Sequence, residues 1–465
     1  MQIGPLKSNK KPDLKNSIYD GIFAHMFATL TGGVFLTGFA LYLGMNEFMI
    51  GLLGAMPFLA TIFQVPTSYL IWKTGRRKKV AYWAAAGARL MWIPILVFGI
   101  LPINLHISRP PFVLTLIFLS HAFVSISYVS WLSWMSDLVP EGIRGRFFGT
   151  RNMLNGAAGM VALLIFGTLL DHLKSRPHWG SSLGFSVIFL SAVSFGILSL
   201  RFLNRVSEPL VEGSGAHPSY GNHLWLPFRQ VNFRRFLVFV LLWSFSVYFA
   251  SPFFTLYFLR DLRFSYGFVA VLATASSLAD LIAMPLWGRI SDKVTNKAAI
   301  QVAGWVAAFL PMAWAAVRPG NVIIPILLHL IGGGFWAGIN LCGSNLLLKI
   351  SPQENRAFFL SMYGIMGGIG AATGPIVSGL ILSSLIDRDL HLLSWEFRPL
   401  QGIFLISSLL RLLSLQLFRH VEEPEEVSVG QLVRILRGVR SLNMATGFSY
   451  LLHPFIEIGR EIRKS

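Results

Sequence analysis

The chain contains twelve long apolar runs, and this feature leaves few folds open to it. A helix that crosses a hydrocarbon core about 30 Å thick needs about 20 mostly apolar residues. Each run meets that length, so we expect twelve transmembrane helices in an all-α integral membrane protein. The expected ranges are 18–43, 49–71, 80–101, 112–136, 148–170 and 183–203 in the first half, and 236–259, 267–287, 298–317, 322–348, 358–386 and 400–418 in the second.

Composition argues against a soluble protein. Hydrophobic residues make up 54% of the chain and charged residues 13%, whereas soluble domains carry about 25% charged residues. The net charge is +18, but the Lys and Arg residues lie in short clusters between apolar runs and not on one polar module. We therefore expect the lipid bilayer as a partner and no nucleic acid. Cys342 is the one cysteine, so no disulfide can form within the chain.

The charges of the loops orient the helices. With the N-terminus in the cytoplasm, the cytoplasmic segments carry more than twice as many Lys and Arg residues as the outer loops, which is the positive-inside bias. Residues 1–15 are polar and basic, so we expect no removable signal peptide. We expect a multi-pass protein of the inner (cytoplasmic) membrane. Both termini are then cytoplasmic, because the number of spans is even.

A polar stretch with several Pro and Gly residues separates the two sets of six runs. We therefore expect an N-terminal six-helix bundle at 1–204, a cytoplasmic linker at 205–235, a C-terminal six-helix bundle at 236–418 and a cytoplasmic tail at 419–465. In the tail, a Glu cluster precedes apolar residues that alternate with arginines. That pattern predicts an amphipathic helix on the inner leaflet. A flexible tail is the alternative.

The two halves repeat each other. Residues 140–147 follow the fourth run and residues 352–359 follow the tenth, and both read Pro-x-x-x-Arg-small-x-Phe, with the arginines at Arg144 and Arg356. A second, weaker pair follows the second and eighth runs. Repeats in the same topological sense are typical of transporters built from two pseudo-symmetric bundles.

At these loops the chain resembles the major facilitator superfamily, whose signature after helix 2 is Gly-x-Leu-x-Asp-Arg/Lys-x-Gly-Arg-Lys/Arg, with a looser copy after helix 8. The first copy here keeps Leu70, Lys73, Gly75, Arg76 and Arg77. The second copy keeps Gly288, Asp292 and Lys293. The resemblance covers about residues 17–418. It implies the fold of that family, with two pseudo-symmetric bundles of six transmembrane helices.

The resemblance also implies that these loops form a conformational latch, in which an Asp caps a helix and pairs with cations of the other bundle. Such charge-assisted bonds can break when the bundles rock. Trp72 occupies the first Asp position, so Asp292 is the expected carboxylate. The alternative is that the cations only set topology. The candidate latch residues are Lys73, Gly75, Arg76, Arg77, Gly288, Asp292, Lys293, Arg144 and Arg356.

Ionisable groups inside a span are costly and are therefore candidates for function. Asp280 lies in the eighth run, about 12 Å inside the helix end at about 1.5 Å per residue, and could exchange a proton during transport. Asp20 and His25 in the first run are further candidates for a proton or substrate role. A structural or packing role is the alternative for each. For Arg89 and Arg411 we expect packing or snorkelling, because helices 3 and 12 are peripheral in the family.

The resemblance implies that helices 1, 4, 7 and 10 line a central cavity. Ligand sites combine aromatic walls with a few polar groups. The candidates from these helices are Tyr128, Trp131, Trp243, Tyr248, Asn340 and Asn345. His121 and His329 lie in the outer halves of the same helices, where packing is the alternative.

These observations predict a secondary active transporter, or permease, that moves a small solute by alternating access with proton coupling. We expect a monomer without cofactor or metal. The sequence has no His-Glu-x-x-His, Gly-x-Ser-x-Gly or P-loop motif, which argues against an enzyme and against ATP-driven transport. A lipid flippase and a non-transporting receptor or scaffold on the same fold remain the alternatives.

Overall fold

The computed structural model describes residues 11–100, 108–176, 180–209, 225–293, 295–385, 390–392 and 395–423. The predicted amphipathic tail helix and the centre of the predicted linker lie outside these residues. Within them, twelve helices are long and apolar enough to cross a membrane. The prediction of twelve transmembrane helices is therefore confirmed by length and composition.

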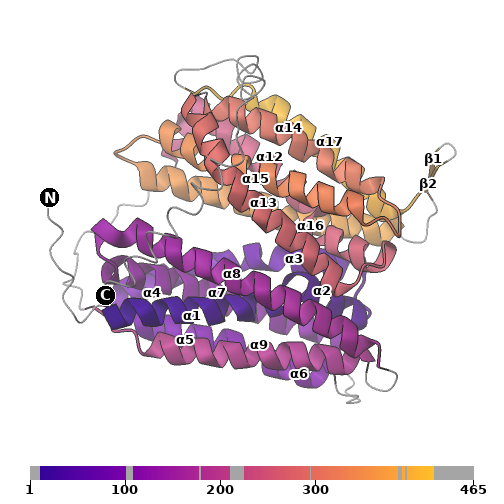
Figure 1. The fold of residues 1–465 in the computed structure, drawn as a ribbon. Helices are drawn as coiled ribbons and strands as arrows, with labels where there is room; N and C mark the ends of the chain where they lie inside the picture. Colours follow the sequence, from indigo (N-terminus) through magenta and orange to yellow (C-terminus); the bar gives the residue numbers. More distant parts are fainter. Residues whose placement is uncertain are drawn as a thin grey trace, which may run out of the picture.

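The N-terminal bundle holds the first six spans (Figure 1). The first span is α1 (Lys11–Leu30) with α2 (Gly33–Tyr42), and the second is α3 (Glu47–Leu59), the short η2 (Ala60–Phe63) and α4 (Gln64–Thr74). The third is α5 (Arg77–Leu90) with α6 (Trp92–Ile100). Single helices make the next three: α7 (Arg109–Leu138), α8 (Glu141–Lys174) and α9 (Gly180–Asn204).

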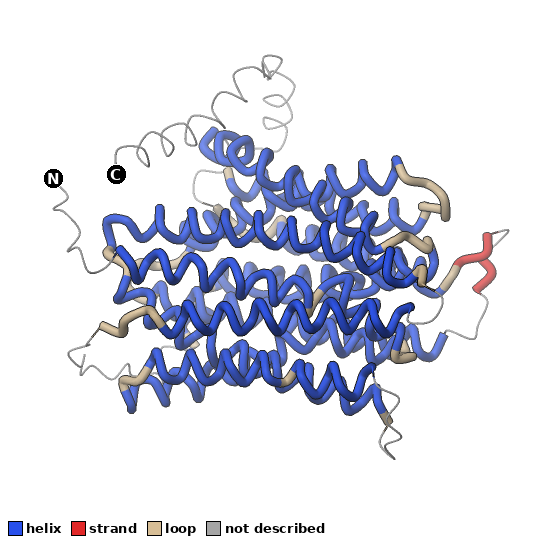
Figure 2. The backbone as a smooth tube through the Cα atoms, turned by 60° about the horizontal axis from the view of Figure 1, so that its bottom comes forward, coloured by secondary structure: helices blue, strands red, loops and turns tan. Residues whose placement is uncertain are grey.

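The C-terminal bundle begins after the short helix α11 (Leu226–Arg229). Its six spans are α12 (Val231–Leu256) with the π-helical turn η3 (Tyr257–Asp261), α13 (Tyr266–Lys293), α14 (Asn296–Ala315), α15 (Ile323–Ile350), α16 (Arg356–Leu385) and α17 (Pro399–Phe418). Strands β1 (Leu390–Leu392) and β2 (Trp395–Phe397) form an antiparallel pair between α16 and α17, with Leu390 opposite Phe397. Figure 2 shows this pair at one end of an otherwise helical molecule.

Several helices extend beyond the predicted ranges because polar end turns continue them. The helix α8 begins at Glu141, not at 148, directly after Pro140, whose fixed φ suits the start of a helix. The first span begins at Lys11 and bends between α1 and α2, where Gly33 has a φ of +50°. A hydropathy window detects only the part that lipid surrounds, so it misses such ends.

The two bundles pack against each other through α3 with α16 and α8 with α13. Glycines permit this close approach. A Cβ atom added to Gly51 on α3 would clash with the carbonyl oxygen of Pro375 on α16, and one added to Gly379 would lie 3.3 Å from the Cα atom of Gly51. On α8, a Cβ atom at Gly167 would lie 3.3 Å from that of Ala270 on α13.

The same helices have free space toward their other ends. A Cβ atom added to Gly145, Gly149 or Gly156 on α8 would meet no described heavy atom within 4 Å outside its own helix backbone. The same holds for Gly364 and Gly368 on α16. In Figure 1 the ribbons of the two bundles also diverge in this direction. We call the end that carries Glu47, Asp171 and Tyr266 the closed end, and the opposite end the open end.

Candidate transport site and gate

The N-terminal bundle encloses a cavity of about 300 Å³. Its wall combines charged, aromatic and small polar residues from α1, α5, α6, α7 and α8. Those that carry the argument are Asp20, Arg89, His121, Tyr128, Trp131 and Arg151. The bundle therefore surrounds a small space with both signs of charge and with flat apolar surfaces, a mixture typical of ligand sites.

One buried carboxylate and two arginines meet at this cavity. Asp20 is 4% exposed, and its Oδ1 accepts a hydrogen bond of 2.7 Å from the Ser199 hydroxyl. Its Oδ2 lies 3.6 Å from Nη2 of Arg151. The Arg89 guanidinium donates from Nη2 to the Ser199 Oγ at 2.8 Å. Ser199 therefore bridges Arg89 to Asp20, and the helices that carry these residues share one polar cluster.

Each guanidinium also has neutral partners that fix its position. Arg89 donates from Nε to the carbonyl of Gly196 at 3.1 Å and from Nη1 to that of Ala85 at 2.8 Å. Arg151 donates from Nε to the carbonyl of Ser17 at 3.1 Å and lies 4.3 Å from the ring centroid of Trp131, which is cation–π geometry. These contacts hold both cations inside the bundle.

Two glycines make room for these side chains. A Cβ atom on Gly21 would lie 2.7 Å from Cζ of Arg151, and one on Gly196 would lie 2.8 Å from Cγ of Arg89. Residues with larger side chains at these positions would displace the guanidiniums. The cluster of Asp20, Arg89 and Arg151 has two cations and one carboxylate, and thus a formal excess of one positive charge.

The C-terminal bundle encloses a larger cavity of about 540 Å³. Tyr248 and Ser251 on α12, Ser276 on α13, His329 and Asn340 on α15 and Arg411 on α17 contribute its polar lining. The Tyr248 ring also lies 4.6 Å, centroid to centroid, from Phe58 on α3 of the other bundle. This cavity therefore borders the interface between the bundles.

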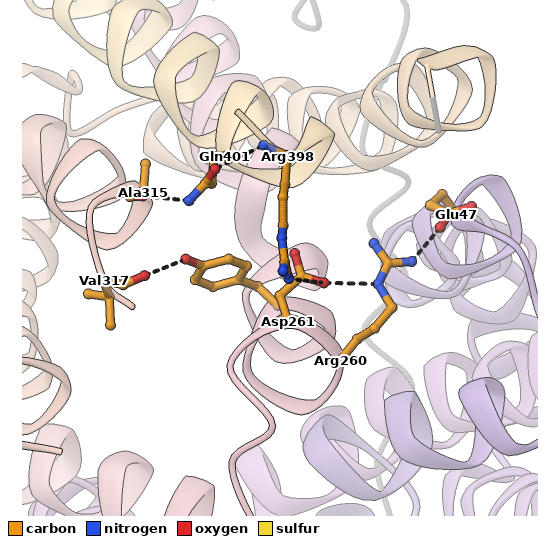
Figure 3. A network of polar contacts seen from close by, with 8 residues as sticks. Glu47, Arg260, Asp261, Ala315, Val317, Arg398 and Gln401 are labelled. Atoms are coloured by element: carbon orange, nitrogen blue, oxygen red, sulfur yellow. Dashed lines mark hydrogen bonds and ion pairs between the residues drawn. The ribbon is translucent and has the colours of Figure 1, made fainter. Parts of the chain in front are cut away.

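Polar contacts join the bundles at the closed end. Nη1 of Arg260, in η3, donates to Oε1 of Glu47 at 2.6 Å, and Nε of Arg260 lies 3.2 Å from Oδ1 of Asp261 (Figure 3). Arg398 lies 3.9 Å from the same Asp261 oxygen. The network runs from α3 through η3 to the start of α17.

A second contact joins α8 to α13. The Asp171 carboxylate accepts hydrogen bonds from the backbone N–H groups of Tyr266, at 2.9 Å, and Gly267, at 2.7 Å. These are the first residues of α13, where unpaired N–H groups and the helix dipole favour a negative charge. Asp171 thus caps a helix of the other bundle.

Two comparisons with known proteins agree with this architecture. The family model described as Major Facilitator Superfamily matches residues 21–268 and 236–456. This chain belongs to the major facilitator superfamily. The resemblance predicted from the loop motifs is therefore confirmed, and so is the fold class. No curated protein matches the chain in sequence.

Solved structures of other major facilitator proteins share the fold. A mutant of the nucleoside transporter NupG superposes with a TM-score of 0.68 and 14% identity, covering 88% of this chain and 100% of that one. A bacterial homolog of the human lysosomal transporter Spinster, inward-facing and unoccupied, superposes with a TM-score of 0.62 and 14% identity, covering 90% of this chain and 95% of that one. The xylose transporter XylE from E. coli, inward open, superposes with a TM-score of 0.60 and 15% identity, covering 91% of this chain and 98% of that one.

The structure brings some of the predicted site residues together and separates others. Asp20, Tyr128, Trp131 and His121 line the N-terminal cavity, and Tyr248, Asn340 and His329 line the C-terminal one. Trp243 is buried, and its ring centroid lies 6.1 Å from that of Trp336. His25, Asp280 and Asn345 line neither cavity.

The exposed His25 ring packs against Gly159 of α8. Asp280 is half-buried, one helical turn beyond Ser276 of the C-terminal cavity. Its carboxylate makes no hydrogen bond or ion pair with the described part of the chain. Asp280 therefore lies on α13 between the C-terminal cavity and the open end, and its predicted coupling role stays a prediction.

The predicted latch residues lie at the open end. Gly75 ends α4 with a φ of +64°, which explains why the major facilitator motif has Gly there. Arg77 forms an ion pair with Asp137, and Arg144 donates to the carbonyl of Ser136 at 2.7 Å. These bonds lie within the N-terminal bundle. Asp292, Lys73 and Arg76 are exposed.

The remaining latch candidates belong to the C-terminal bundle. Gly288 faces Leu341 of α15, Lys293 ends α13, and Nε of Arg356 is buried without a hydrogen-bond partner in the described structure. The latch function of the whole set stays a prediction.

Sequence reasoning does not find Arg151, because this residue lies near the polar start of its run, where an interfacial position is ordinary. For Arg89 the sequence predicts packing or snorkelling. In the structure Arg89 is 8% exposed and bonded inside the bundle, which is the packing alternative. The available signal was the presence of Gly21 and Gly196 on neighbouring helices, and it is visible only once the helices are assembled.

Proposed function

We propose that this chain is a secondary active transporter that moves a small solute across the membrane by alternating access. The observation that carries the proposal is the asymmetry of the bundle interface. The helices α8, α13 and α16 contact the other bundle at the closed end, while glycines on α8 and α16 border free space toward the open end. Two bundles that touch at one end can exchange that contact for one at the other end.

Orientation follows from the loop charges. Both the first residues of α1 and the loops that carry the latch motif lie at the open end. The positive-inside rule places these segments in the cytoplasm of a cell with an inner membrane. On that reading the structure is the inward-facing state. Closure of the cytoplasmic side would then engage the latch residues across the bundles, and the contacts of Glu47 and Asp171 would break.

We assign proton coupling to Asp20 ahead of Asp280. Asp20 is paired with Arg151 and Ser199 at the wall of a cavity, so adding a proton removes the charge that holds Arg151. The freed guanidinium could then bind solute, which links the two events. Asp280 lacks such a partner among the described residues and stays the second candidate.

The test is solute-driven proton movement in proteoliposomes that contain the pH dye pyranine. Sugars, nucleosides, amino acids, organic acids and drugs are added in turn. We expect one class to change the internal pH, and we expect Asp20→Asn to abolish that change while solute counterflow persists. Glu354→Gln, an exposed carboxylate, is the matched control and should behave like the wild type.

Three outcomes would contradict parts of the proposal. Absence of counterflow for every class would count against transport of a small solute and favour the flippase or scaffold alternative. Counterflow that never moves protons would remove the coupling. Loss of proton movement in Asp280→Asn but not in Asp20→Asn would transfer the coupling role to Asp280.

A further inference from the structure

We infer that the cavity of the C-terminal bundle binds an organic anion with a flat apolar body, and that Arg411 holds its anionic group. The inference rests on the proposed transport function, because it names the class of solute. It begins with a buried cation whose charge the described protein does not balance.

Arg411 is 3% exposed and lines the cavity. Its Nη1 donates to the carbonyl of Ala307 at 2.8 Å, and its Nη2 lies 3.5 Å from the carbonyl of Val247. Its Nε has no hydrogen-bond partner in the described structure. A guanidinium has five N–H donors, so several of them lack a strong acceptor here.

One of these bonds has a structural purpose that needs no charge. Pro311 follows Ala307 by four positions on α14 and has no N–H, so the carbonyl of Ala307 lacks its usual helical donor. Arg411 supplies the missing donor. Any neutral N–H donor that reaches this carbonyl could do the same, so the structural bond does not explain why a positive charge lies here.

The buried arginines of the two bundles differ in whether a carboxylate balances their charge. Arg89 reaches the carboxylate of Asp20 through Ser199. Among the described residues, Arg411 forms no ion pair with a carboxylate, and both of its acceptors are neutral carbonyls. An unpaired buried charge is costly. A bound anion would supply the missing partner, and the guanidinium would hold a carboxylate by charge-assisted bonds.

The aromatic residues of the cavity wall favour a ligand whose uncharged part is flat and apolar. Phe254, Phe258, Trp314 and Trp336 line the same cavity, which has a volume of about 540 Å³. Pockets of about 300–1,000 Å³ hold drug-sized molecules. Aromatic walls stack on flat apolar groups, and a single cation suits a single negative charge. The geometry therefore fits an aromatic monocarboxylate.

The test compares 2-naphthoate with its neutral analogue 2-naphthamide, using the melting temperature of the full-length protein in detergent. A ligand that binds only the folded state raises the melting temperature in a saturable way. We expect saturable stabilisation by naphthoate and at least tenfold weaker apparent affinity for naphthamide. In Arg411→Gln, naphthoate affinity should fall at least tenfold, while naphthamide affinity stays unchanged.

Two further variants make the comparison specific. Arg419→Gln removes the same charge from the exposed end of α17 and should bind naphthoate like the wild type. Arg411→Lys keeps the charge and should retain part of the affinity.

Equal stabilisation of the wild type by naphthoate and naphthamide would overturn the inference, even if no variant of Arg411 folds. Unchanged naphthoate affinity in Arg411→Gln would overturn it as well. Binding is measured here without transport, so the two proposals fail separately. If naphthoate binds through Arg411 but no solute shows counterflow, the inference of an anion site stands and the proposal of a transporter is rejected.

Discussion

At the scale of single residues, the N-terminal cavity is defined by charges that depend on one another. Asp20 is surrounded by Arg151 and, through Ser199, by Arg89. Removing one member of a buried ion pair leaves an uncompensated charge, which costs about 3–5 kcal/mol. Removing both members costs less, because no charge is left without a partner.

We therefore expect Asp20→Ala to lower the melting temperature in detergent more than the double variant Asp20→Ala/Arg151→Gln does. The coupling energy should be about 1–3 kcal/mol, as is usual for residues within one network. Glu354→Ala, at an exposed position, serves as a control and should change little. Additive effects of the Asp20 and Arg151 substitutions would show that the two side chains do not interact.

The same residues show how much of a site can be predicted from a sequence. Asp20 is predicted because a carboxylate inside a span is costly. Tyr128 and Trp131 are predicted because the resemblance implies that helix 4 lines a cavity and ligand sites have aromatic walls. All three line the N-terminal cavity. Arg151 could not be predicted in the same way. Its position depends on the rotation of α8 about its axis and on the gap at Gly21, and neither is encoded in local periodicity.

At the scale of helices, the gate at the closed end depends on the junction of α8 with α13. Asp171 stabilises the first turn of α13 from outside its own bundle. Charged groups at helix N-termini contribute about 0.3–1 kcal/mol each, and the two hydrogen bonds to a charged acceptor about 1.5–3 kcal/mol each. The junction is thus strong enough to bias a two-state equilibrium and weak enough to break in each cycle.

We expect Asp171→Ala to shift the protein away from the state in which the two bundles touch at the closed end. Spin labels on His172→Cys and Val322→Cys, which are exposed on opposite bundles at the closed end, should report a longer distance in this variant. Labels on Glu141→Cys and Gln353→Cys at the open end should report a shorter one. An unchanged distance distribution for both pairs would mean that Asp171 does not hold the gate.

Helix existence was predictable because a bilayer demands long apolar runs, and all twelve were found. Internal breaks were not predictable to the same degree. The turn η2 follows Pro57 in α3, and η3 adds a π-helical turn that presents Arg260 to Glu47. Such local departures from the α-helix depend on packing with other elements.

At the scale of the whole molecule, the close contact of Gly167 with Ala270 offers a direct test of rocking bundles. Their Cβ positions lie 3.3 Å apart, near the range of about 3.5–4.5 Å that a disulfide spans. The only natural cysteine, Cys342, is buried elsewhere.

We expect the double variant Gly167→Cys/Ala270→Cys to lose at least nine-tenths of its solute counterflow after mild oxidation, and to regain it with a reductant. Each single variant should be insensitive to oxidation. Full counterflow in the oxidised, cross-linked protein would show that this contact does not open during the cycle.

The excess positive charge in the N-terminal cavity has an electrical consequence. In the proposed alternating-access cycle, a cavity with a formal excess of one positive charge carries that charge with it when its access changes from one side of the membrane to the other. When one elementary charge crosses the whole membrane, a potential of 100 mV changes its free energy by about 2.3 kcal/mol. In such a cycle, and in a cell whose interior is negative, the voltage therefore favours the empty protein with its N-terminal cavity toward the cytoplasm.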